Sequence, residues 1–104
     1  MAEPAPVLDA LGDANRRAIL EILARGACPV GEIAERLPIS RPAVSRHLRL
    51  LKQAELVTDE QRGTRRVYRL RSEGVEAVRA YFEQVWGDAA ARFAIAADNL
   101  GPQR

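Results

Sequence analysis

The sequence has only one cysteine, Cys28, and one histidine, His47, among its 104 residues. A single thiol cannot form a disulfide within the chain, which fits a reducing compartment, and it supplies no spaced pair of metal ligands. There is also no glycine-rich phosphate loop and no convergent pair of carboxylates that could run a reaction with the histidine. We therefore expect a protein that is not an enzyme and that has no cofactor and no bound metal.

Long apolar runs, internal repeats, linkers and low-complexity segments are missing as well. No stretch is long and apolar enough to span a bilayer, and the first residues, MAEPAPVLDALGD, are too acidic and too interrupted by proline for a signal peptide. A chain with 47% hydrophobic residues can bury one modest core, and two copies would bury more. We expect a single cytoplasmic domain over residues 1–104 with no membrane partner.

Positive charge is concentrated in one segment, although the net charge is only +2. The segment from Ser40 to Arg71 has nine basic residues and three acids, so it carries +6 and the remainder carries −4. Such a segment suits a protein with one face toward a polyanion and a soluble remainder. A solvated charged surface is the alternative explanation where no binding motif accompanies the charge.

Periodic apolar residues predict three helices before Ser40. The first is a short helix near residues 7–11, and the second is capped by Asp13, carries Ile19, Leu20 and Leu23 on one stripe, and ends at Gly26. The third runs over residues 30–37 and is stopped by Pro38. A fourth follows at once, because Ser40 is a good N-cap and Pro42 is tolerated in a first turn.

This fourth helix, over residues 40–53, has two different faces. At about 100° per residue, Val44, Leu48 and Leu51 share a narrow arc, and the opposite side is polar and basic. That side consists of Pro42, Ser45, Arg46, Arg49 and Gln53. Because the connection LPIS to the preceding helix is short, residues 30–53 read as a helix-turn-helix whose second helix enters the major groove of double-stranded DNA.

Residues 56–71 are predicted to form a basic β-hairpin, or wing. Its strands, Leu56–Gln61 and Arg65–Arg71, are joined by a turn at Arg62-Gly63-Thr64. Ser72 then caps a terminal helix to residue 100, whose stripe comprises Val75, Val78, Phe82, Val85, Ala89, Phe93, Ala96 and Leu100. The predicted fold is mainly α with a small hairpin, a winged helix-turn-helix in the order α-α-α-α-β-β-α.

The chemistry of these elements suits DNA. Arg46 and Arg49 can reach guanine edges or a phosphate, and Arg41 can do either. Ser40 and Ser45 can bond to phosphate or base at shorter range. On the wing, Arg62, Arg65 and Arg66 suit contacts with the backbone that do not depend on sequence.

Three segments resemble the ArsR (arsenical-resistance repressor) family of bacterial winged-helix regulators. They are DALGDANRRAILEIL, the run ISRPAVSRHLRLLKQAELV and the hairpin GTRRVYRL, which together span roughly Leu8 to Leu70. The resemblance implies a homodimer that binds inverted-repeat operators and usually represses. It also implies helix contacts by Arg41, Ser45, Arg46 and Arg49, and wing contacts by Arg65 and Arg66.

In this family the dimer forms through the first and last helices. The resemblance therefore implies an interface over residues 5–11 and 72–100. Its expected members are Leu8, Leu11, Val78, Phe82, Val85, Trp86, Ala89 and Phe93. Aromatic residues at helical spacing in a terminal helix also suit an effector pocket between subunits, but dimer core is the more common use.

The chain departs from the metal-sensing members of the family. The thiolate pair of those members would fall near Pro29 and Gly31, beside the lone Cys28, so no Cys-x-Cys exists. The carboxylate and imidazole ligands that such members carry on the last helix are also missing. The one histidine, His47, instead lies in the helix over residues 40–53, which we call the recognition helix. We expect the metal-independent branch, and the sequence identifies no small-molecule effector.

Three alternatives remain open. His47 lies beside the packed arc, where it either orients the helix by packing and hydrogen bonding or contacts a phosphate. Cys28 is a small residue at the entry of a helix or, through an intersubunit disulfide, a redox switch. Finally, a winged helix can serve as a protein-interaction module without specific DNA binding, although such a module has little use for so concentrated a basic surface.

Overall fold

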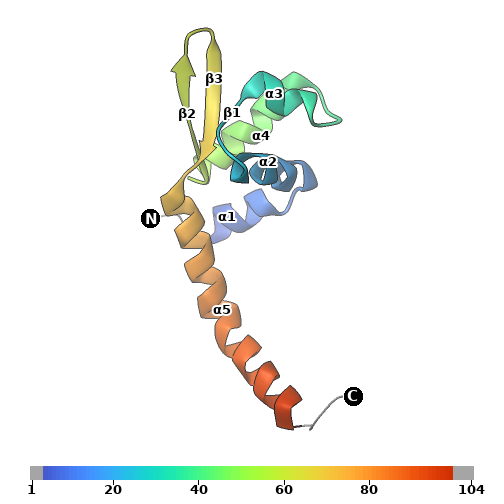
Figure 1. The fold of residues 1–104 in the computed structure, drawn as a ribbon, viewed down its shortest axis with the longest axis vertical. Helices are drawn as coiled ribbons and strands as arrows, with labels where there is room; N and C mark the ends of the chain where they lie inside the picture. The colour runs from blue at the N-terminus through green and yellow to red at the C-terminus, as the bar shows by residue number, and fades with distance from the viewer. Residues whose placement is uncertain (1–3, 100–104) are drawn as a thin grey trace.

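In a computed structural model, which describes residues 4–99, the chain forms a compact head and one long projecting helix (Figure 1). The helices are α1 (Pro4–Leu11), α2 (Ala14–Ala24), α3 (Val30–Glu35), α4 (Arg41–Gln53) and α5 (Ser72–Asn99). The strands are β1 (Cys28–Pro29), β2 (Val57–Arg62) and β3 (Arg65–Leu70). We call residues 4–71 the head. Within the described residues, no helix is long and apolar enough to cross a membrane.

Side-chain caps start α2 and α4, as the sequence predicts. An oxygen of Asp13 accepts hydrogen bonds from the backbone N–H groups of Asn15 and Arg16, at 2.8 and 3.1 Å. The hydroxyl of Ser40 accepts one from the N–H of Ala43 at 3.2 Å. These N–H groups have no partner inside their own helix, so each cap stabilises the first turn where the chain changes direction.

The sequence predicts a two-stranded hairpin, but the structure has a three-stranded sheet, because the short strand β1 joins the hairpin. Strand β1 pairs antiparallel with β3, with Cys28 opposite Tyr68 and Pro29 opposite Val67, and the sheet order is β1-β3-β2. Two residues are too few to show alternation, and a proline argues against a strand except at an edge. Cys28, which the sequence places at the entry of a helix, instead lies in this edge strand. Since β1 directly precedes α3 and pairs with β3, it fixes the start of α3 against the wing.

The hairpin turn is confirmed. Arg62 lies opposite Arg65, so Gly63 and Thr64 form a two-residue turn, and Gly63 has a φ of +61° that glycine adopts without strain. Strand β2 lies one residue later than the predicted Leu56–Gln61, so Arg62, predicted in the turn, is its last residue. Strand β3 begins at the predicted Arg65 and ends at Leu70, one residue before the predicted end. Helix α3 ends at Glu35, two residues before the predicted end.

The core of the head lies between the helices and the base of the wing. Its largest fully buried side chains are Ile19 of α2, Ile33 of α3, Val44, Leu48 and Leu51 of α4, and Val57 of β2. Burying each such side chain contributes about 1.5–3 kcal/mol. Because three of them come from one stripe of α4, any rotation of α4 about its axis would expose apolar surface. The predicted packed arc is thus confirmed.

The start of α5 packs closely against the backbone that follows the end of α4. Glu55 adopts a φ of +63°, and the N–H groups of Glu55 and Leu56 bond to the carbonyls of Lys52 and Leu51, both at 3.0 Å, in a Schellman motif. Gly74 lies directly against this motif. A Cβ there would overlap the carbonyl oxygen of Glu55 and stand 3.0 Å from the Cα of Leu56. The glycine therefore permits α5 to leave the head at this angle.

Helix α5 gives the molecule an extended shape. The principal extents are 60 × 33 × 21 Å, and the radius of gyration is 17.5 Å, against about 13 Å for a compact domain of this length. Figure 1 shows α1 against the first part of α5 and the remainder of α5 projecting alone. Leu100, where the predicted terminal helix ends, lies outside the described residues. A helix with so little contact to its own head leaves one side available to another molecule.

Candidate nucleic-acid interface

The face of α4 opposite the core is exposed along its whole length. Its members are Pro42, Ser45, Arg46, Arg49 and Gln53, all of them exposed, and Arg41 is exposed beside it as the first residue of the helix. Packing of the opposite stripe holds this face outward. The structure therefore leaves the predicted contacts Arg41, Ser45, Arg46 and Arg49 exposed on α4, which lies beside the wing (Figure 1).

The three exposed arginines of α4 are chemically available. Among the described residues, Arg41, Arg46 and Arg49 form neither ion pairs nor side-chain hydrogen bonds. A guanidinium carries five N–H donors in a planar fork, which matches the two acceptors of a guanine edge or two oxygens of a phosphate. The face can donate many hydrogen bonds to an anionic partner without first breaking contacts of its own.

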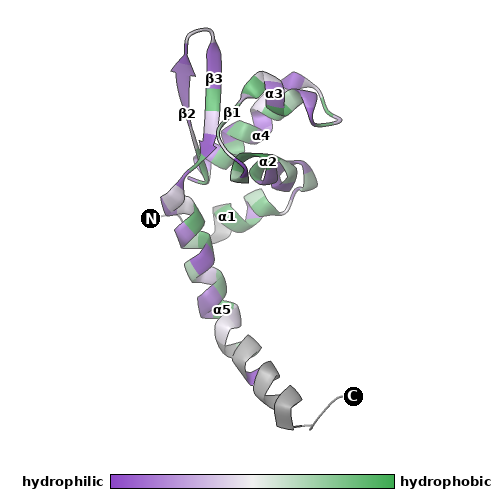
Figure 2. Ribbon diagram, viewed as in Figure 1, coloured by the Kyte–Doolittle hydropathy of each residue, from purple (hydrophilic) through white to green (hydrophobic). Residues whose placement is uncertain are grey.

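The wing arginines differ, because each is paired with a carboxylate. Arg62 and Arg69 share one oxygen of Glu60 at 2.8 and 2.6 Å, and Arg66 lies 2.7 Å from Asp59. The wing strands are accordingly hydrophilic over most of their length in Figure 2. The positive charge that the sequence assigns to the wing is thus largely balanced within the protein, and its pairs are mostly exposed and weak.

Arg65 connects the wing to the helix-turn-helix. Its guanidinium lies 2.9 Å from the carboxylate of Glu32 on α3, and both side chains are about half exposed. The other oxygen of Glu32 lies 3.7 Å from the Sγ of Cys28. Burial and then the negative charge of Glu32 raise the pKa of the Cys28 thiol above its usual value. The thiol is therefore protonated and shielded at neutral pH, which makes it a poor metal ligand and a slow nucleophile.

The side chain of His47 lies against α2 rather than on the exposed face of α4. Only 13% of its side chain is exposed. Arg16 donates to its Nδ1 at 3.2 Å and also to the carbonyl of Ala10, at the end of α1, at 2.8 Å. The structure brings His47 to the junction of α1, α2 and α4, which matches the packing alternative. Its contact with DNA stays a prediction.

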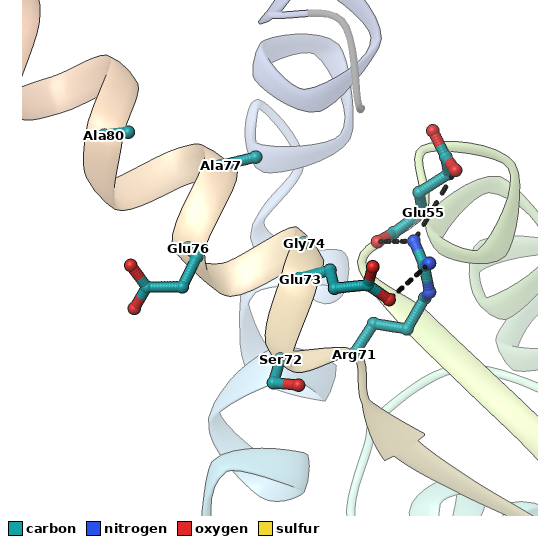
Figure 3. A pocket seen from close by; sticks show the side chains of 8 residues that line it. All are labelled: Glu55, Arg71, Ser72, Glu73, Gly74, Glu76, Ala77 and Ala80. Atoms are coloured by element: carbon teal, nitrogen blue, oxygen red, sulfur yellow. Dashed lines mark hydrogen bonds and ion pairs between the residues drawn. The ribbon is translucent and has the colours of Figure 1, made fainter.

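A pocket at the start of α5 has the opposite charge from this surface (Figure 3). Three of its lining residues are acids, Glu55, Glu73 and Glu76, and its one cation is Arg71. Arg71 lies 3.5 Å from the carboxylate of Glu55 and 2.9 Å from that of Glu73, as the dashed lines in Figure 3 mark. An excess of carboxylates repels phosphate, so the pocket does not extend the candidate interface.

The residues predicted for dimerisation divide into two groups. Leu11 and Val78 are partly buried against the core of the head. The others are exposed where the structure describes their side chains: Leu8, Phe82, Val85, Trp86 and Ala89. The side chain of Phe93 lies outside the described part of the chain. On α5 the exposed members, joined by Val75, share an arc of about 100° and are largely apolar.

Sequence reasoning missed the acids that organise the surface, namely Glu32, Asp59 and Glu60. Asp59 and Glu60 were detectable, since a two-residue turn after Arg62 sets a register that puts Arg66 diagonally across from Asp59. No comparable signal joins Glu32 to Arg65, because their contact depends on how α3 docks against the wing.

The chain is similar to known transcriptional regulators. Residues 11–60 match the family model described as a helix-turn-helix domain. The chain is 50% identical over 92 residues to the HTH-type transcriptional regulator Rv2034 of Mycobacterium tuberculosis (strain H37Rv), covering 88% of this chain and 86% of that protein. It is 30% identical over 76 residues to the arsenical resistance operon repressor of Staphylococcus xylosus, covering 73% of each chain.

Solved structures agree with these similarities. A possible transcriptional regulator for arsenical resistance matches with a TM-score of 0.76 and 35% identity, over 88% of this chain and 95% of that one. The homodimeric winged helix-turn-helix DNA-binding domain of a possible ArsR-family regulator from Mycobacterium bovis matches with a TM-score of 0.66 and 32% identity, over 85% and 82%. Both likenesses extend well beyond the helix-turn-helix itself.

Proposed function

The chain belongs to the ArsR family of winged helix-turn-helix transcriptional regulators, and from that membership we propose that it is a homodimeric repressor that binds an inverted-repeat operator. The observation that carries the proposal is the exposed face of α4. Two arginines of that face, Arg46 and Arg49, form no ion pair with any described residue, and three fully buried side chains behind them fix its direction. A rigid helix with free forked donors suits the major groove.

Helix and wing have different tasks in this proposal. Arg46 and Arg49 contact base edges and provide specificity, with Ser40, Arg41 and Ser45 at base edges or flanking phosphates. Arg62, Arg65 and Arg66 contact the backbone beside the groove. Since those wing arginines are already paired with acids, each phosphate contact replaces or shares an existing ion pair, and the wing adds less affinity than its charge suggests.

A second copy of the chain covers the apolar stripe of α5. The side chains of Val75, Phe82, Val85 and Trp86 are 40–60% exposed, and Leu8 on α1 is 38% exposed. An exposed apolar stripe on an extended helix costs free energy in water and marks an interaction surface. A two-fold pairing of α1 and α5 with their copies places two α4 helices on one duplex, as an inverted repeat requires.

DNA binding is tested first by selecting duplexes from a random library with the purified protein. On the selected duplex, Arg46→Ala should weaken binding by about 1–3 kcal/mol and relax specificity. Arg65→Ala should weaken selected and random duplexes alike and reduce the salt slope by about one. Arg25→Ala, which removes an exposed charge at the end of α2, outside α4, the wing and α5, is the control and should change little. Failure to enrich any duplex would refute the proposed function.

Dimerisation is tested by sedimentation velocity on charge variants of α5. Val85→Glu should yield monomers that bind the selected duplex poorly, because a carboxylate cannot be buried at an apolar interface without a partner. Gln84→Glu is the matched control, since its exposed side chain lies about 180° from the first turn of the stripe at 100° per residue. An intact Val85→Glu dimer would refute this interface.

We also infer that DNA release does not depend on a metal. The support is the donor set around Cys28, a single buried thiol with a raised pKa and one neighbouring carboxylate. Soft metals prefer several thiolates or imidazoles at set spacing. Titration of the protein–DNA complex with zinc or arsenite should release no DNA, and elemental analysis should find no metal. Release at stoichiometric metal would overturn the inference.

A further inference from the structure

Asp59, on β2, is an acid in the middle of the basic surface, and its carboxylate joins two elements. Only 6% of its side chain is exposed. One oxygen lies 2.8 Å from the Nζ of Lys52, in the last turn of α4, and the other lies 2.7 Å from the Nη1 of Arg66, on β3. A single shielded carboxylate thus links the recognition helix to the wing.

Lys52 lies at the edge of the exposed surface of α4, and Arg66 reaches the same carboxylate from β3. Lys52 is seven positions after Ser45, so at about 100° per residue the two lie within about 20° of each other around the helix. Lys52 is 56% exposed and Arg66 is 46% exposed. Lys52 has three N–H donors and Arg66 has five, and Asp59 uses one from each. Both side chains are therefore partly exposed, and among the described residues each keeps N–H donors that Asp59 does not use.

We propose that Asp59 is a positioning residue for DNA binding, whose carboxylate holds Lys52 and Arg66 side by side as a paired site for one backbone phosphate. The site lies at the junction of α4 and the wing, where the backbone would pass from one to the other. The inference rests on the proposed function and deepens it. Its chemistry is that of two cations on one anion, a tetrahedral phosphate with several acceptor oxygens.

The charge state of Asp59 agrees with this role. The hydrogen bond from Lys52 lowers the pKa of the Asp59 carboxyl below its usual value, outweighing the opposing effect of burial, and the bond from Arg66 lowers it further. The carboxylate is therefore ionised throughout the neutral range. Loss of that charge would leave two neighbouring cations with no anion between them, and both side chains are long enough to separate.

Glu60, the next residue on β2, is a matched comparison. Its carboxylate is also paired with two cations, Arg62 and Arg69, but both belong to the wing, and 47% of the Glu60 side chain is exposed. Among the described residues, it pairs with no element outside the wing. Glu60→Gln and Asp59→Asn each remove one negative charge. A difference in DNA binding between the two variants therefore reports the positioning of Lys52 and Arg66 rather than the change in net charge.

The test measures binding to the selected duplex and to a random duplex at several salt concentrations by fluorescence anisotropy. Charge alone predicts that both variants bind DNA more tightly than the wild type. Positioning predicts tighter binding for Glu60→Gln but roughly tenfold weaker binding for Asp59→Asn, the effect of one charge-assisted contact. It also predicts a salt slope lower by about one for Asp59→Asn. Equal or tighter binding by Asp59→Asn would overturn the proposal.

Two further variants guard against a loss of fold. Asp59→Glu keeps the charge and should restore most of the affinity and the salt slope. Lys52→Met leaves Arg66 to neutralise Asp59 and should lower the salt slope by about one, whereas a merely structural role would leave that slope unchanged. An unchanged slope in Lys52→Met would also overturn the proposal. Wild-type protein that binds no DNA would instead refute the proposed function.

Discussion

Replacement of Gly74 by alanine tests how closely α5 approaches the head. Alanine is favoured over glycine inside a helix by about 0.8–1 kcal/mol, so helix propensity alone predicts that Gly74→Ala stabilises the protein. The structure predicts the opposite. The added Cβ would overlap the carbonyl oxygen of Glu55 and stand 3.0 Å from the Cα of Leu56, whereas carbon atoms pack best at about 3.5–4.0 Å.

The neighbouring atoms cannot move aside easily. They are backbone atoms of the Schellman motif that ends α4, and the N–H of Arg71 donates to the carbonyl of Leu56 at 2.9 Å. Overpacking of this kind costs about 1–3 kcal/mol. Because the gain in helix propensity offsets part of this cost, Gly74→Ala should lower the free energy of unfolding by up to about 2 kcal/mol.

Gly87→Ala is the control, because the same substitution in the same helix meets nothing within 4 Å. It should be stabilised by about 0.8–1 kcal/mol, so the two variants should differ by the overpacking cost alone, about 1–3 kcal/mol. In thermal unfolding followed by circular dichroism, that difference corresponds to roughly 4–8 °C for each kcal/mol. Protein concentrations must be equal, since dimerisation affects Tm. Equal rises in Tm for both variants would refute the close approach.

Three further predictions concern capping, pH and thiol chemistry. Ser40→Ala should lower the free energy of unfolding by about 1 kcal/mol and Ser40→Gly by only a few tenths, measured in urea; equal losses would contradict the cap. The hydrogen bond from Lys52 lowers the pKa of Asp59 in the folded protein. The ionised Asp59 carboxylate therefore stabilises the fold above its unfolded pKa, near 3.9, and this stabilisation is lost as the pH falls through the folded pKa. Melts from pH 6 to 2 should therefore show a smaller acid loss in Asp59→Asn, and parallel curves would refute this. Burial and the charge of Glu32 raise the pKa of Cys28, so Ellman's reagent should label the native thiol slowly at pH 8 and rapidly in urea; fast native labelling would contradict the shielding.

Much of the fold and half of the candidate site follow from local sequence. The two faces of α4, its cap at Ser40 and the turn at Gly63 each depend on residues within a few positions of one another, where helical or hairpin geometry leaves little choice. The buried stripe of Val44 and Leu48 and the exposed arginines opposite were predictable for that reason, and the structure has both.

Contacts between distant segments depended on the tertiary structure. Strand β1 is recognisable only by its pairing with β3, about 40 residues later in the chain. Glu32 meets Arg65 because of how α3 docks on the wing, and Gly74 is required because α5 leaves the head against the end of α4. Helix and turn geometry cannot set such approaches, since they arise when separate elements pack their apolar faces together.

By itself, then, the sequence determined that this chain has a recognition helix with a basic outer face, a wing and an apolar terminal helix. The tertiary structure decided which of the basic residues are free. Arginines on α4 are held outward by the core behind them and remain unpaired among the described residues, while those of the wing meet acids across strands and from α3. Charge is a property of composition, but its availability depends on neighbours that only the folded chain brings within reach.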